Sequence, residues 1–302
     1  NATGTVTFSG EVVLRNGGQL IINGTQDVEF LGGIRFEADA AGHVGGLHVS
    51  ATNTKVNFLS GLFAGQNDAM GWEGVKTLDL LAPTSLTQKG SLSVTGDAVV
   101  LSEAPGFANL NLNLDALTLH ATSLSMPTNS AVTVNMNLGL LDIDAGLGIG
   151  SSAAHLKVNA DHVIAHATGG DVFLQITGSQ SVTLDVQTRA SGVAAIDAAQ
   201  DLVLAADTTV NAVDITLAAA RDLQFTGISA QGDLVLSAGR DMTVAGAITA
   251  GALSISSTSG NVTQASGSTF VVGSTTTLST GSGAVMTLDH ANQWGHSVTV
   301  EG

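Results

Sequence analysis

The sequence predicts an all-β protein that folds as a parallel β-helix, a β-solenoid with about 19–22 residues per coil. Short tetrapeptides of one type recur at nearly constant spacing, and their residues alternate between apolar and other types. Gly, Ala, Ser, Thr and Asn separate them, and no stretch shows a helical period with caps. A unit of about 20 residues cannot bury its own apolar face, so successive units must stack to form one core.

The tetrapeptides form two interleaved series. The first consists of DLVL at 201–204, DLQF at 222–225, DMTV at 241–244 and NVTQ at 261–264, at steps of 21, 19 and 20. The second consists of DITL at 214–217, DLVL at 233–236 and ALSI at 252–255, at two steps of 19. Because their second and fourth residues are mostly apolar, the tetrapeptides are typical of strands with one buried face. Each coil therefore has at least two strands.

The three prolines of the chain give an independent measure of coil length. Pro83, Pro105 and Pro127 each follow a strand-like run and are equally spaced, at an interval of 22. Proline cannot donate to a hydrogen-bond ladder, so we expect all three at one corner of successive coils. Further strand-like runs occupy 141–144, 155–158, 171–176 and 181–186.

The pattern indicates one continuous solenoid with two regions. Residues 1–90 keep strand alternation but with a less regular period or inserted loops, and we expect them to form N-terminal β-helical coils. Residues 91–302 are expected to form a regular β-helix shaft.

The composition excludes several classes of partner. Nine Lys and Arg against 25 Asp and Glu give a net charge of -16, and no basic cluster occurs, so we expect no nucleic acid partner. No apolar run approaches the ~20 residues that cross a bilayer, and acidic surfaces are repelled by anionic lipids, so no membrane insertion is expected. Without cysteine, packing and backbone hydrogen bonds must stabilise the fold.

Acidic or amide residues open the strands of the first series. These residues are Asp201, Asp222, Asp241 and Asn261, and Arg221 and Arg240 precede two of them. On stacked coils the carboxylates would lie about 4.8 Å apart, so one interpretation is a site for a cation or a sugar. The other is structural: each Asp hydrogen-bonds local turn backbone, and the Arg offsets charge repulsion between coils. We favour the structural interpretation, because scaffold features repeat whereas a site is usually made once.

We identify no catalytic, cofactor-binding or metal-binding set of residues, and predict that the protein is not an enzyme. Parallel β-helices also host polysaccharide lyases and hydrolases, but Asp142 and Asp144 lie on one strand as surface acids commonly do, and basic residues are scattered. His162 and His166 would point the same way about 13 Å apart, too far to share a metal. Glycine-aspartate calcium repeats are not found.

The AxxDL and AGRDM phrases, with ALSISSTSGNVTQ and the stretch from Gly273 to Gly302, resemble the shaft repeats of filamentous-haemagglutinin-type exoproteins. These are large adhesins of two-partner secretion, and the resemblance is clear over residues 197–302. It implies a right-handed β-helix, export through an outer-membrane partner of a Gram-negative cell, and adhesion, aggregation or a role in biofilm matrix. The Asn-Pro-Asn-Gly-type motif of that family's secretion domain does not occur, so we expect a shaft segment of a longer protein.

We therefore expect a secreted or cell-surface adhesin or biofilm-matrix segment that acts as a stiff rod without catalysis. An exopolysaccharide or a host or cell-surface glycan is the expected ligand. A self-assembling structural fibre, associating end to end or side by side, is the alternative. A carbohydrate-active β-helix enzyme ranks below both.

Overall fold

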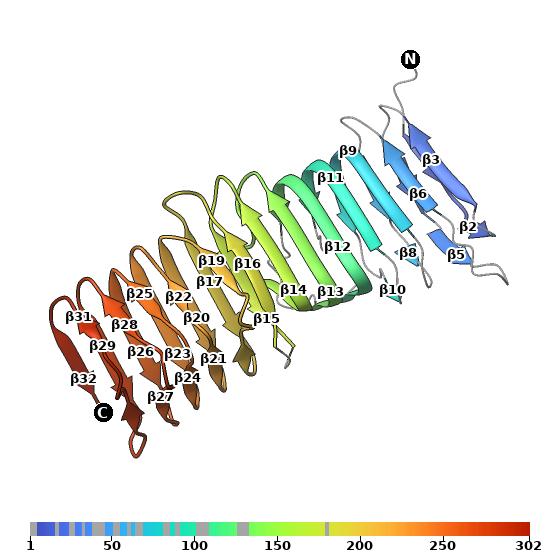
Figure 1. Ribbon diagram of the computed structural model, residues 1–302. Helices are drawn as coiled ribbons and strands as arrows, with labels where there is room; N and C mark the ends of the chain where they lie inside the picture. Colours follow the sequence, from blue (N-terminus) through green and yellow to red (C-terminus); the bar gives the residue numbers. More distant parts are fainter. Residues whose placement is uncertain are drawn as a thin grey trace. The chain divides into compact units, whose positions relative to one another are not determined.

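The structure is a computed structural model of the chain (Figure 1). It describes residues 5–15, 18–23, 28–31, 34–37, 46–50, 55–58, 62–63, 69–80, 85–87, 91–100, 109–125, 133–178 and 181–302. The chain forms two compact units, Asn1–Ala160 and Asp161–Gly302. All regular elements of the described residues are β-strands, and their ladders are parallel, which confirms the predicted fold class.

Strands of the first unit pair coil upon coil. One set contains β1 (Val6–Phe8), β4 (Val28–Phe30), β7 (Lys55–Phe58) and β9 (Ala69–Leu80). A second contains β3 (Gln19–Asn23) and β6 (Gly46–Ser50), followed by β9, β11 (Ser91–Val100), β12 (Asn109–Ser125) and β13 (Thr133–Ala145). A third contains β2 (Val12–Arg15), β5 (Ile34–Glu37) and β8 (Leu62–Phe63), and β10 (Ser85–Thr87) pairs with β12.

Coil length in the first unit varies. Val6 is in register with Val28, a step of 22, whereas Val28 is in register with Val56, a step of 28. The steps from β11 to β12 and from β12 to β13 are 25 and 24, as in Leu92 to Leu117 and Leu117 to Leu141. Across these different steps the paired strands keep apolar residues in register with apolar residues, as in Phe8, Phe30 and Phe58.

In the second unit, β16 (Thr183–Gln187) pairs with β14 (Leu156–Ala167) and with β19 (Thr209–Asn211). Three longer ladders follow in this unit. The first ladder is β15 (Val172–Ile176), β17 (Val193–Ala198), β20 (Asp214–Ala219), β23 (Asp233–Ala238), β26 (Ala252–Ser257), β29 (Thr276–Thr280) and β32 (Val298–Glu301). The second is β18 (Leu202–Val203), β21 (Leu223–Phe225), β24 (Met242–Val244), β27 (Val262–Gln264) and β30 (Met286–Thr287). The third is β22 (Ile228–Ser229), β25 (Ile248–Ala250), β28 (Phe270–Val272) and β31 (Gln293–Trp294).

The two tetrapeptide series are confirmed as two of these ladders. Leu223 is in register with Met242, and Ile215 with Leu234, so the repeats of the sequence are coils of the solenoid. The third ladder was not predicted. Its strands have only two or three residues, too few to show a period of two.

The core of the second unit consists of columns of aliphatic side chains. Leu174, Ile196, Leu217, Leu236 and Ile255 form one column in successive coils, and each is fully buried. Alternate residues face outward, so β20 and β26 both have the burial pattern of a half-buried strand. Each buried aliphatic side chain stabilises the fold by about 1.5–3 kcal/mol, and only stacking provides this burial.

Coil length in the second unit ranges from a step of 19, as in Leu234 to Leu253, to a step of 24, as in Val262 to Met286. The longest coils thus exceed the predicted 19–22. The coil after Val262 has two added turns, closed by hydrogen bonds of Ser268 N to Ala265 O and Ala284 N to Gly281 O. Their third residues, Gly267 and Gly283, both have φ of 84°, a value that suits glycine at this turn position.

The predicted strand runs at 141–144, 155–158, 171–176 and 181–186 coincide with β13, β14, β15 and β16. Pro83, Pro105 and Pro127 lie outside the described residues, so the predicted proline corner stays a prediction. The structure also does not test the division of the solenoid at residue 90. Among the described residues, no helix has the length and apolarity of a membrane span.

One buried hydroxyl of the core has no hydrogen-bond partner. Thr276 lies in an inward column between Leu253 and Val298, and its Oγ1 is buried and unpaired. Because valine has nearly the same shape, we expect Thr276→Val to raise the free energy of unfolding by about 1 kcal/mol. Urea unfolding measures this change. Thr277→Val, on the outward face of the same strand, is the control, and a lower stability of Thr276→Val would contradict the prediction.

Candidate functional site

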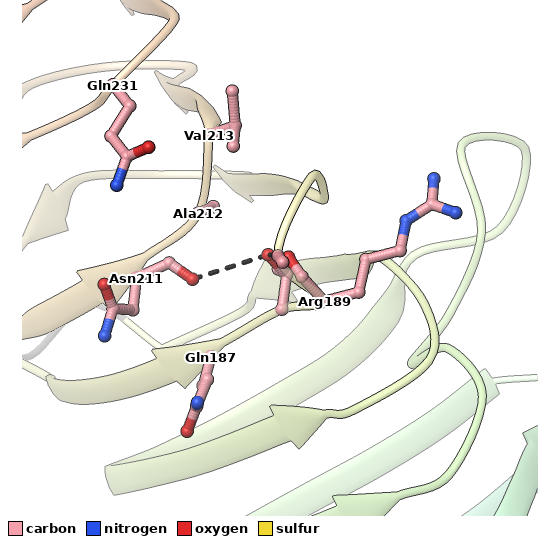
Figure 2. Close-up of a pocket in the computed structure, with 8 residues that line it drawn as sticks. Gln187, Arg189, Asn211, Ala212, Val213 and Gln231 are labelled. Atoms are coloured by element: carbon pink, nitrogen blue, oxygen red, sulfur yellow. Dashed lines mark hydrogen bonds between the residues drawn. The ribbon is translucent and has the colours of Figure 1, made fainter.

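A hollow of about 260 Å³ lies at a corner of the second unit (Figure 2). It is lined by Gln187, Thr188, Arg189, Ala190, Asn211, Ala212, Val213 and Gln231. Five residues connect β16 to β17 at this corner, but only two connect β19 to β20 on the next coil. The longer connection therefore overhangs the shorter one and leaves the hollow between them.

Hydrogen bonds fix the overhanging connection. Thr188 N donates to Asn211 O at 3.1 Å, Gly192 N donates to Arg189 O at 2.9 Å, and Val213 N donates to Gly192 O at 3.0 Å. The turn is tight at Gly192, where an added Cβ would lie 2.6 Å from Thr188 Cβ. The shape of the hollow is thus determined by the backbone.

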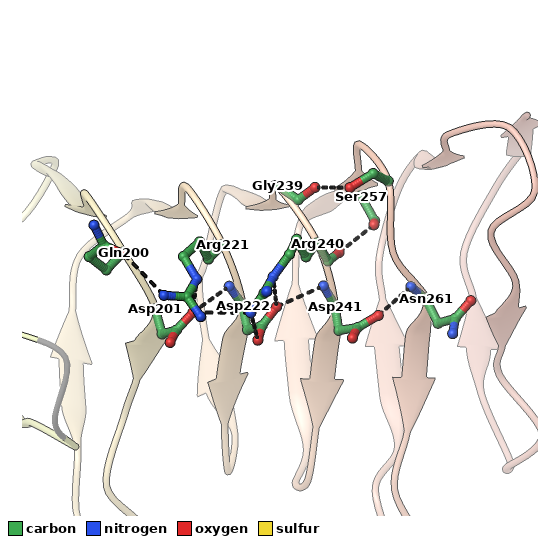
Figure 3. Close-up of polar contacts among 10 residues, drawn as sticks. Gln200, Asp201, Arg221, Asp222, Gly239, Arg240, Asp241, Ser257 and Asn261 are labelled. Atoms are coloured by element: carbon green, nitrogen blue, oxygen red, sulfur yellow. Dashed lines mark hydrogen bonds and ion pairs between the residues drawn. The ribbon is translucent and has the colours of Figure 1, made fainter.

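The acidic residues at the strand entrances form a ladder from coil to coil (Figure 3). Asp201 Oδ1 accepts a hydrogen bond from Asp222 N at 3.1 Å, and Asp222 Oδ1 accepts one from Asp241 N at 3.1 Å. Asp241 Oδ1 accepts from Asn261 N at 2.7 Å, and Asn261 Oδ1 from Val285 N at 2.9 Å. Each side chain thereby pairs a backbone donor where the strand ladder begins.

Two arginines connect the same carboxylates. The Arg240 guanidinium binds Asp222 of the preceding coil through two hydrogen bonds, Nε to Oδ1 at 3.0 Å and Nη2 to Oδ2 at 2.6 Å. Arg240 Nη2 also lies 3.8 Å from Asp201 Oδ1, two coils away, and Arg221 Nε lies 3.3 Å from the same oxygen. Asp222 and both arginines are more than a third exposed, so water screens each ion pair and its contribution to stability is small.

The hydrogen-bonded Arg240 guanidinium holds the pKa of Asp222 below its usual value, and desolvation opposes this effect. The hydrogen bond from Asp241 N and the charge of Arg221 lower the pKa further. Asp222 in turn raises the pKa of Arg240.

These contacts support the structural interpretation of the Arg-Asp pairs, but the predicted hydrogen-bond partner is wrong. We expected each Asp to bond the backbone of its own turn, whereas the donor belongs to the next coil. The arginines do offset charge between coils, as predicted. The same bond recurs elsewhere in the unit, since Asp214 Oδ1 accepts from Asp233 N at 2.8 Å.

The histidines and acids considered from the sequence do not gather into one site. His162 and His166 share the outward face of β14, and His166 Nε2 lies 3.5 Å from Asp185 Oδ2 of β16. Asp142 and Asp144 lie on β13. Within the part of the chain that the structure describes, no group of three or more His, Asp or Glu could hold a metal ion.

The hollow was missed because its amides lie on separate segments. Gln187 ends β16, Asn211 ends β19 and Gln231 follows β22, and no motif links them in the sequence. The one sequence signal for the hollow is the difference in length between two successive connections, five residues from β16 to β17 against two from β19 to β20.

The fold is that of a parallel β-solenoid repeat protein. Residues 231–301 match a family model described as repeats of unknown function (DUF5649). This segment includes β23 to β32. No curated protein and no solved structure matches the chain.

The ladder at Asp222 predicts a difference between two substitutions. Asp222→Ala leaves Asp241 N without its acceptor and Arg240 without its bidentate partner, so we expect a loss of about 1 kcal/mol in urea unfolding. Asp222→Asn keeps an amide oxygen, which Asn261 shows to be a sufficient acceptor, and should lose less. Asp233→Ala removes an exposed Asp side chain outside the ladder and is the control. Equal losses for Asp222→Ala and Asp233→Ala would argue against the ladder.

The lowered pKa of Asp222 makes part of the stability depend on pH. Because the folded pKa is below the unfolded value of about 3.9, this stability is present above that value and is lost as the pH falls through the folded pKa. We therefore expect the stability difference between the wild type and Asp222→Asn to shrink from about pH 7 to about pH 3. Urea unfolding across this range tests it, and a difference independent of pH would refute the effect.

Proposed function

We propose that this chain is a non-catalytic segment of a secreted or cell-surface adhesin or biofilm-matrix protein of the filamentous-haemagglutinin type. It acts as a stiff rod that mediates adhesion or aggregation. The resemblance over residues 197–302 supports this proposal, as does the match to a repeat family over 231–301. Export through an outer-membrane partner of a Gram-negative cell, and a location outside the cell or on its surface, belong to the same proposal.

The observation that carries the proposal is the use of charged side chains between coils. All three arginines of the second unit, Arg189, Arg221 and Arg240, pair with an Asp from an earlier coil. The backbone ladders hold one coil on the next, and these exposed pairs offset the charge of the carboxylates between coils, each with a small contribution to stability. A scaffold that carries load has a use for bonds between successive coils.

The outward face of the first ladder in the second unit suits many weak contacts. It consists mainly of short side chains, including Thr216, Ser237, Ser254, Ser256, Thr277 and Ser279. They repeat from coil to coil at the strand spacing of about 4.8 Å, so a long polymer can meet the same group several times. Weak contacts repeated along a rigid support give high avidity, which fits an exopolysaccharide or a cell-surface glycan as ligand.

Retention of cells and polysaccharide on beads coated with the purified chain tests the proposal. We expect coated beads to capture more cells that produce this protein, or more of the exopolysaccharide of those cells, than beads coated with serum albumin. Beads coated with the chain after irreversible heat unfolding are the second control, since a rod mechanism needs the folded solenoid. Equal capture by folded and unfolded chains, or no capture by the folded chain, would contradict the proposal.

The alternative is a self-assembling structural fibre, in which chains associate end to end or side by side through strand edges. Negative-stain images of the purified chain at rising concentration decide between the two, because fibres support the alternative and dispersed particles that bind glycan support the adhesin.

A further inference from the structure

We infer that the hollow beneath the connection from Thr188 to Gly192 is a binding site for one residue of an uncharged glycan. This inference rests on the proposed adhesin function and names the place and the chemistry of one contact. Gln187, Asn211 and Gln231 supply the binding groups. They come from three neighbouring segments, and Figure 2 shows them one below another along the hollow.

The amides of the hollow are free to bind a ligand. The side chains of Gln187, Asn211 and Gln231 are exposed, and none makes a hydrogen bond to another described group. Each primary amide has two donor hydrogens and an acceptor oxygen. Sugar hydroxyls also donate and accept, so a row of amides matches them without requiring charge.

The strand register determines the distance between two of the three amide residues. Gln187 and Asn211 are Cα partners in the parallel pairing of β16 with β19, which places their backbones about 4.8 Å apart. Gln231 lies in the connection between β22 and β23, on the following coil. Both amides of the register pair can therefore reach the same sugar ring.

The charges at the hollow favour an uncharged ligand. Arg189 is the only charged residue of the lining, and its Nε lies 3.3 Å from Asp171 Oδ1. Figure 2 shows its guanidinium directed away from the three amides. The net charge of -16 repels uronic acids and phosphorylated sugars, and no cation in the lining is left to attract them.

The size of the hollow sets the mode of binding. Its 260 Å³ lies just below the ~300 Å³ at which pockets for drug-sized ligands begin, so it fits a single sugar residue. No aromatic ring lines it, and the amides lie at the surface, so we expect affinity in the millimolar range. The hydrogen-bonded connection above it preorganises the site, which reduces the entropy lost on binding.

Nuclear magnetic resonance of the 15N-labelled chain tests the inference through the side-chain amides themselves. Maltohexaose, cellohexaose and mannohexaose are the uncharged probes, and trigalacturonate is the anionic one. We expect at least one uncharged probe to shift the NH2 signals of Gln187, Asn211 and Gln231 saturably, and trigalacturonate not to do so. The signal of Gln224, an exposed amide on β21, should not move.

Single alanine substitutions locate the binding. We expect Gln187→Ala, Asn211→Ala and Gln231→Ala each to weaken binding by about fivefold or more, and Gln224→Ala to leave it unchanged. All four residues are exposed, so we expect each substitution to leave the thermal midpoint of unfolding unchanged. If one variant does not fold, the remaining variants still test the site. No shift with any uncharged probe at about 10 mM, or equal weakening by Gln224→Ala, would overturn the inference.

The bead assay separates this inference from the proposed function. If the three alanine variants still adhere and the wild type shows no saccharide-induced shifts, the binding site is refuted and the adhesin function is retained. If saccharides bind at the hollow but the folded chain does not adhere, the adhesin function is refuted and the binding site is retained.

Discussion

Every feature of the second unit depends on the parallel hydrogen-bond register between one coil and the next. The register forces residues that recur at the coil length into columns, so a position along the coil acquires one environment for the whole stack. Inward columns hold Leu236 and its equivalents, outward columns hold mainly short side chains such as Ser254, and strand entrances hold Asp222 and its equivalents. Variation in coil length is tolerated only where it leaves the columns unchanged, which is why the added turns at Gly267 and Gly283 lie between strands.

The same register explains how much of this architecture could be predicted from the sequence. Leu223 and Met242 recur with their neighbours in a short alternating pattern, and burial of alternate residues is a local property that the sequence shows directly. Strand β22 has two residues, so the sequence has no alternation to show there, and its ladder becomes visible only when Ile228 is placed over Ile248. The carboxylate of Asp222 bonds the backbone donor of Asp241 on the next coil, which no local turn rule predicts.

The hollow and the ladder show two uses of polar side chains on one scaffold. In the ladder, the carboxylates of Asp201 and Asp222 are bound by backbone donors and guanidinium groups of the protein itself. In the hollow, the amide of Asn211 lies beside a corner whose backbone bonds already hold it in place, so its side chain has no structural partner to satisfy. A polar side chain on this solenoid is therefore available to bind a ligand where backbone hydrogen bonds alone stabilise the corner.

Arg240 reaches across three coils, since it contacts Asp222 on one neighbour and Asp201 on the next. A coil bonded only to its neighbours could detach by breaking one interface at a time. Here, separating the coil of Asp241 from that of Asp222 also releases the contact with Asp201. Although water screens these exposed pairs, their charges link three successive coils rather than two, so the loss of one end coil changes the contacts of the two coils before it.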